Sequence, residues 1–179
     1  NGTDAGRALN RRVELITDHW EPLTDQFPSL AIGSVAISPL DNAGDPVTGA
    51  TPLDDLVIFA GTGRFSNFLQ QGGQAVGLLR STDGGDTWSL GGVPELVGLS
   101  ITSVVPTGET TVDGQVVLVS TLNKLDSSRN VIKEGGVFRS TDGGQTFTKV
   151  LDVPTSSLVS DPGAPLRFYA GTVGHGTGS

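Results

Sequence analysis

Two stretches that repeat one another along the chain decide the fold. Residues 76–88 read Val-Gly-Leu-Leu-Arg-Ser-Thr-Asp-Gly-Gly-Asp-Thr-Trp, and residues 135–147 read Gly-Gly-Val-Phe-Arg-Ser-Thr-Asp-Gly-Gly-Gln-Thr-Phe. The second stretch lies 59 positions after the first, and eight of its thirteen residues are identical. This agreement indicates an internal repeat, and a repeat constrains the fold before any single element is considered.

The repeat extends into apolar runs on the N-terminal side of both stretches. At the same offset of 59, Leu56–Thr62 matches Gln115–Thr121, and Arg167–Thr172 ends in a third copy of the run. These segments are rich in β-branched residues and predict strands. A further strand is expected before each run, ending at a proline because proline lacks the N–H that a strand interior needs. The three prolines are Pro39, Pro106 and Pro162.

Each unit therefore contains four short antiparallel strands, with an Asp-Gly-Gly turn before the last one, as in a propeller blade. We predict an all-β chain that forms a partial β-propeller of about two and a half four-stranded antiparallel blades. The expected segments are residues 1–30 as the end of a preceding blade or an N-terminal extension, 31–98 and 99–153 as blades, and 154–179 as the first half of a further blade. Residues 1–19 fit a helical insert or a degenerate strand, and Trp20–Asp25 fits the last strand of the preceding blade.

Ten positions of the two stretches correspond to the pattern Ser-x-Asp-x-Gly-x-Thr-Trp, with Phe147 in place of the Trp in the second copy. They are Ser81, Asp83, Gly85, Thr87, Trp88, Ser140, Asp142, Gly144, Thr146 and Phe147. The pattern resembles the Asp-box, or BNR repeat, of propellers in sialidases, xyloglucanase-like endoglucanases, sortilin-like receptors and photosystem assembly factors. This resemblance implies a structural turn at the rim, away from the central pocket. A short acidic side chain can accept hydrogen bonds from N–H groups in such a turn. The alternative is that the two Asp residues bind calcium or act as catalysts.

The composition narrows the classes of function. The chain has 179 residues, a net charge of −8, no cysteine and only two histidines, His19 and His175. It lacks the clustered Lys and Arg that nucleic acids and anionic membranes require. It also lacks an apolar run of the roughly 20 residues that span a bilayer. Without cysteine, and with the histidines far apart in sequence, we expect no metal site and no cofactor.

Two long connections between strands supply the candidate binding residues. The first carries Arg64, Phe65, Asn67 and Phe68, and the second carries Asn123, Lys124, Asp126 and Arg129. Aromatic rings stack on the apolar faces of sugars while amides and Arg bond to hydroxyls, so the first connection fits a carbohydrate site. The alternatives are that the Phe side chains hold their loop against the blade, and that the charged residues form a solvated face.

The sequence predicts no catalytic residue. Sialidase chemistry, as the resemblance implies it, needs a Tyr nucleophile, and the only tyrosine, Tyr169, lies within an apolar strand and is expected in the core. We therefore expect a non-catalytic segment of a larger extracellular or cell-surface protein that binds carbohydrate or protein or serves in assembly. The alternative is a fragment of a sialidase-like or endoglucanase-like glycoside hydrolase. The expected partners are the remaining blades in the same polypeptide or other copies of the chain, because a ring of about four blades needs more than 179 residues.

Overall fold

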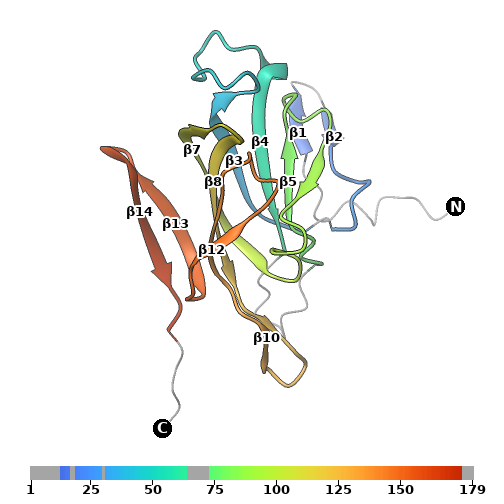
Figure 1. The fold of residues 1–179 in the computed structure, drawn as a ribbon. Helices are drawn as coiled ribbons and strands as arrows, with labels where there is room; N and C mark the ends of the chain where they lie inside the picture. The colour runs from blue at the N-terminus through green and yellow to red at the C-terminus, as the bar shows by residue number, and fades with distance from the viewer. Residues whose placement is uncertain (1–12, 17–18, 30, 64–72, 175–179) are drawn as a thin grey trace, which may run out of the picture.

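The protein is built from two four-stranded antiparallel sheets with a two-stranded hairpin at each end (Figure 1). The computed structural model describes residues 13–16, 19–29, 31–63 and 73–174. The first sheet has the order β3 (Ile32–Asp41), β4 (Leu56–Thr62), β5 (Leu78–Ser81) and β6 (Ser89–Gly91). The second has the order β7 (Ser100–Thr111), β8 (Gly114–Leu122), β11 (Gly136–Ser140) and β12 (Thr148–Leu151). The predicted all-β chain of four-stranded antiparallel blades is confirmed.

Short hairpins make up the rest of the described structure. The remaining strands are β1 (Val13–Ile16), β2 (His19–Pro22), β9 (Lys124–Leu125), β10 (Val131–Lys133), β13 (Thr155–Asp161) and β14 (Ala164–Thr172), and a 3₁₀ turn covers Leu53–Asp55. β1 pairs antiparallel with β2, so Val13–Ile16 form a strand and not a helix. Residues 1–12 and 17–18 of the expected helix or degenerate strand lie outside the described residues. β13 pairs with β14 in the same antiparallel way beyond the second sheet.

The strand ends expected at Pro39 and Pro106 are wrong. β3 continues past Pro39 to Asp41, and β7 continues past Pro106 to Thr111. Both strands lie at the edge of their sheets, where a missing N–H costs no ladder bond. Each ladder also shifts register in this region, as a β-bulge does. The third proline, Pro162, does follow the last residue of its strand, β13.

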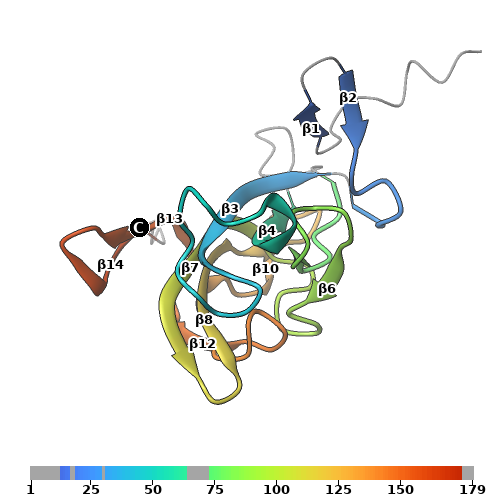
Figure 2. The same ribbon diagram turned by 90° about the horizontal axis from the view of Figure 1, so that it is seen from above.

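The largest apolar cluster lies between the two four-stranded sheets. Phe59 of β4 and Leu78 of β5 are fully buried in one cluster with Ile101, Val104 and Val117 of the second sheet. Burying a side chain of this size stabilises a fold by about 1.5–3 kcal/mol. This packing places the edge strands β3 and β7 next to one another (Figure 2).

The opposite faces of the two sheets are covered in part, and Val35 and Ile37 of β3 stay more than half exposed. On the first sheet, Ile58 and Trp88 pack with Phe27, which precedes β3 in the chain. On the second sheet, Leu118 packs with Leu158 of β13. Successive residues of a strand point to opposite faces. β4 and β8 therefore each contact one neighbour before them and another after them in the chain.

Tyr169 is not in the core, so this prediction is wrong. Its side chain on β14 is 56% exposed. By register it corresponds to Phe59 of β4 and Leu118 of β8, and each of these is covered by the sheet that follows in the chain. Among the described residues no sheet follows β14, so its tyrosine is uncovered.

Gly61 allows the two four-stranded sheets to approach closely. A Cβ atom at this position would lie 2.8 Å from Ile101 Cβ, so β7 would have to move. We predict that Gly61→Ala lowers the free energy of unfolding by about 1–3 kcal/mol through overpacking. Gly49→Ala is the control, because Gly49 is exposed and its added atom would have nothing within 4 Å. Chemical denaturation measures both variants, and equal stability of the two would contradict this packing.

Candidate functional site

The two Asp-Gly-Gly turns hold their acidic side chains in the same way. In the first turn, Asp83 accepts hydrogen bonds from Ser81 Oγ at 2.7 Å and from Thr87 N at 2.9 Å. The Thr87 hydroxyl donates to the second carboxylate oxygen. Asp142 makes the same contacts in the second turn, 2.6 Å from the serine hydroxyl and 3.0 Å from the threonine N–H. Both carboxylates are therefore engaged within their own turns.

The glycines and the aromatic residues complete each turn. Gly84 and Gly85 have φ angles of 69° and 113°, in the left-handed region that favours glycine. This conformation lets Gly85 N donate to Ser81 Oγ at 2.8 Å. Trp88 Nε1 donates to Gly85 O at 2.7 Å, which ties the ring to the turn. Phe147 has no such donor, and its ring is buried in the cluster between the two sheets.

The pKa values of these two carboxyl groups argue against acid catalysis at the turns. Partial burial raises the pKa of both, but the hydrogen bonds from the surrounding Ser, Thr and backbone groups outweigh it, and the pKa of Asp83 and of Asp142 lies below the ordinary value. A general acid in glycoside hydrolysis needs a raised pKa. Within the described residues, no group of three or more acidic or histidine side chains is placed to hold a metal ion.

A cleft lies at the end of the sheets opposite these turns. In an antiparallel meander, the connection from β4 to β5 and the turn from β5 to β6 fall at opposite ends of the sheet. The cleft has a volume of about 410 Å³ and is lined by Gly73, Gln74, Ala75, Val76, Val97, Gly98, Ser100, Leu122, Asn123, Lys124 and Leu125. It is thus formed by the connections between strands of both sheets. Its volume is in the range of small-molecule sites.

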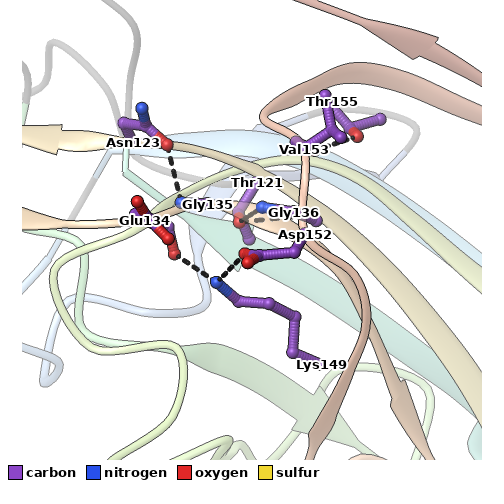
Figure 3. A network of polar contacts seen from close by, with 9 residues as sticks. All are labelled: Thr121, Asn123, Glu134, Gly135, Gly136, Lys149, Asp152, Val153 and Thr155. Carbon is purple, nitrogen blue, oxygen red and sulfur yellow. Dashed lines mark hydrogen bonds and ion pairs between the residues drawn. The ribbon is translucent and has the colours of Figure 1, made fainter. Parts of the chain in front are cut away.

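The structure brings two of the predicted binding residues to this cleft. Asn123 and Lys124 both line it. The Asn123 side-chain oxygen accepts a hydrogen bond from Gly135 N at 2.7 Å, so it also fixes the start of β11 (Figure 3). Lys124 packs across Gly98, where a Cβ atom would lie 2.9 Å from Lys124 Cδ. Arg64, Phe65, Asn67 and Phe68 lie outside the described residues.

Asp126 and Arg129 lie in the tip of the β9–β10 hairpin and do not line the cleft. Asp126 accepts hydrogen bonds from Ser128 N at 2.8 Å and from the backbone and side chain of Asn130 at 2.8 and 3.1 Å. The bonds from Asn130 are the main reason that the pKa of Asp126 is lowered. Arg129 has a φ of 68°, as a tight turn requires. These contacts favour a local structural role for Asp126.

Lysine contacts fix the wall of the cleft. Lys133 of β10 donates to the carbonyls of Pro94 and Val97 at 3.0 and 2.9 Å, which ties the hairpin to the connection between the two sheets. Burial is the main cause that lowers the pKa of Lys133. Lys149 of β12 donates to Glu134 O at 3.1 Å and pairs with an aspartate of the following turn (Figure 3). These contacts hold in place the hairpin and the connection that border the cleft.

Gln74 and Ser100 line the cleft but are not among the candidate binding residues chosen from the sequence. Gln74 is near the end of the first long connection, and Ser100 begins β7. Their proximity depends on how the two sheets pack, which no local pattern shows. Among the described lining residues there is no carboxylate and no histidine. Amide, hydroxyl and ammonium groups can bind a polar ligand, but they do not supply the pair of carboxyl groups used in glycoside hydrolysis.

Comparison with known proteins finds a similarity that extends over most of this chain. The chain is 28% identical over 151 residues to a xyloglucanase of Hypocrea jecorina (strain QM6a). The match covers 81% of this chain and 16% of the relative, so the chain spans about one sixth of that protein. No protein-family model matches the chain, and no solved structure does. The fold and this similarity together define a propeller-like, all-β segment that resembles part of a glycoside hydrolase. Within the described residues, no helix is long and apolar enough to span a membrane.

The lowered pKa of Asp142 gives a test of the turn. A carboxylate with a lowered folded pKa stabilises the fold above its ordinary unfolded pKa of about 3.9, and this stabilisation is lost as the pH falls through the folded pKa. We predict that Asp142→Asn lowers the melting temperature at pH 7, and that the gap from the wild type narrows at acidic pH. Thermal unfolding across this pH range measures the effect.

The control for this experiment is Asp113→Asn. Asp113 lies in the exposed turn between β7 and β8, and no hydrogen bond to its carboxylate is present among the described residues. This variant should change the melting temperature little at pH 7. A constant gap for Asp142→Asn at pH 7 and in acid would show that ionisation of its carboxylate is not what stabilises the turn.

Proposed function

We propose that this chain is a segment of an Asp-box β-propeller in an extracellular glycoside hydrolase that acts on a xyloglucan-like polysaccharide, and that its cleft forms part of the polysaccharide-binding surface. The observation that carries the proposal is the cleft of mixed polar and apolar lining at the end of the sheets where the long connections meet. Gln74, Ser100, Asn123 and Lys124 place amide, hydroxyl and ammonium groups along it. Such groups can donate to and accept from sugar hydroxyls.

Two further observations support the proposal. The similarity to a xyloglucanase covers 81% of the chain, which is more than a single repeat could produce. The two turns have the contacts expected of Asp-box turns, with an ionised Asp between a Ser and a Thr. A location outside the cell belongs to the same proposal.

In this proposal these blades bind the polysaccharide, and residues in other parts of the hydrolase cleave the glycosidic bond. The described lining of the cleft has no carboxylate, and the turn carboxylates have lowered pKa values. An acid and a base or nucleophile, separated by about 5–9.5 Å, would then come from other parts of the hydrolase. Substitutions in this cleft should therefore weaken substrate binding more than they slow bond cleavage by bound substrate.

The test is the affinity of the natural polypeptide for xyloglucan oligosaccharides, measured by calorimetric titration. We predict that Gln74→Ala combined with Lys124→Ala weakens binding by about tenfold, as expected for the loss of one or two hydrogen bonds. Glu109→Ala is the control, because Glu109 is exposed and lies on β7 away from the cleft lining. Equal affinity of the double variant and the control would contradict the proposed surface.

Measuring the release of reducing sugar from xyloglucan distinguishes the two functions that the sequence left open, a glycoside hydrolase and a non-catalytic carbohydrate-binding protein. Hydrolysis with an increased KM and a nearly unchanged kcat in the double variant supports a binding role within an enzyme. Binding without hydrolysis by the natural polypeptide would replace the hydrolase proposal with a non-catalytic carbohydrate-binding protein.

A further inference from the structure

A second cleft lies at the end of the sheets that carries the Asp-Gly-Gly turns. It has a volume of about 560 Å³ and is formed between β3, β7 and the tip of the β13–β14 hairpin. In Figure 1 this tip lies toward the top, whereas β10, whose hairpin borders the first cleft, lies near the bottom. The two clefts are therefore at opposite ends of the sheets, and the proposed polysaccharide site does not include the second one.

Proline rings form much of the wall of this second cleft. Pro39, Pro106, Pro162 and Pro165 all line it, and the ladders of β3, β7 and β13 each shift register at this level. A proline offers an aliphatic surface and a carbonyl acceptor but no N–H donor. Ile37, which is 59% exposed, extends the apolar surface. The wall is therefore apolar and richer in hydrogen-bond acceptors than in donors.

The charge of this cleft comes from Asp161, which alone is charged among the described residues that line it. Its Oδ1 atom accepts a hydrogen bond from Gly163 N at 2.8 Å. Its Oδ2 atom has two longer contacts, 3.4 Å to the Tyr169 hydroxyl and 3.6 Å to Arg167 Nη1. A charge-assisted hydrogen bond is usually shorter, about 2.7–2.9 Å. Because the Arg167 side chain is 65% exposed, a cationic ligand can compete with it for this oxygen.

The surroundings of the second cleft are acidic as well. Asp41 ends β3, Asp45 lies in the connection after it, and the exposed Glu109 follows Gly108 of the lining on β7. The three lysines of the sequence make their contacts at the opposite end of the sheets; they are Lys124, Lys133 and Lys149. A cleft surrounded by charges of one sign concentrates ligands of the opposite sign. The expected ligand is therefore a cation with an apolar body.

We infer that the second cleft binds a lysine side chain of a peptide segment, with the alkyl stem along the proline rings and the ammonium group on Asp161 Oδ2. Lysine has a flexible aliphatic stem that packs on apolar surface and an ammonium group with three donors and no acceptor. The cleft, at about 560 Å³, is larger than one lysine side chain, so neighbouring residues of the peptide fit as well. A sugar fits less well, because the described lining has no aromatic, amide or cationic side chain.

The test is the binding of an end-blocked, fluorescently labelled peptide, with one lysine between two leucines, to the natural polypeptide, measured by fluorescence polarisation. We expect Asp161→Asn to weaken binding by about tenfold, as for the loss of a hydrogen bond between charged groups. The amide oxygen of this variant still accepts from Gly163 N, so the turn is retained. Arg167→Gln removes the competing guanidinium and should strengthen binding by about twofold.

Asp113→Asn is the matched control, because it removes the same charge from the exposed turn between β7 and β8, and Asp113 does not line the cleft. It should leave the affinity nearly unchanged. Equal losses in Asp161→Asn and Asp113→Asn would reduce the binding to general attraction by an acidic surface and overturn the inference. No binding by the wild type, or equal binding by the wild type and Asp161→Asn, would also overturn it.

Two further probes identify the occupant. A peptide with acetyl-lysine keeps the alkyl stem and loses the charge, so equal affinity for it would show that the cleft takes an apolar group and not a cation. Pentylamine carries the same stem and ammonium group without a peptide, and binding as tight as that of the peptide would assign the cleft to a free amine. Either result overturns the inference. Sugar binding is not measured in these experiments, so failure of the proposed function would not affect their outcome.

Discussion

A small antiparallel sheet with two apolar faces is stable only if both faces are covered, and this requirement determines most of the present structure. Phe59 and Ile58 are neighbours on β4, yet the first is buried against the second four-stranded sheet and the other is buried against the segment before β3. No sheet of this protein forms a core alone. The position of the connecting loops, and with them the cleft, follows from how the sheets cover one another.

The repeated turn contributes in a different way, because it satisfies polar groups where the chain reverses. An ionised Asp accepts hydrogen bonds from a serine hydroxyl, a threonine hydroxyl and a backbone N–H. The same atoms cannot easily serve in proton transfer as well. The protein therefore separates stability at one end of the sheets from ligand-accessible polar groups at the other.

The sequence predicted the features that depend on local chemistry. The repeated turns at residues 81–88 and 140–147 predicted the blades, and their period predicted the strands around β4 and β8. The sequence-based predictions failed where the position of a strand or side chain depends on the neighbouring strands and sheets. Pro106 lies inside a strand because that strand is at a sheet edge, and Tyr169 is exposed because no described sheet covers it. Asn123 and Lys124 could be selected from their loop, but Gln74 and Ser100 join them only through packing of the two sheets.

The contact between neighbouring sheets has a geometrical consequence. β3 and β7 are joined by a serine hydroxyl and by side-chain packing. Among the described residues no strand ladder connects the two sheets, although Gly92 N donates to Gln145 O at 2.8 Å between them. A ladder would impose one spacing and one direction, whereas side-chain packing lets the angle between sheets vary with the volume of a few residues. Gly61 against Ile101 is such a pair. Small changes of size at these positions would therefore alter the angle at which one sheet lies on the next.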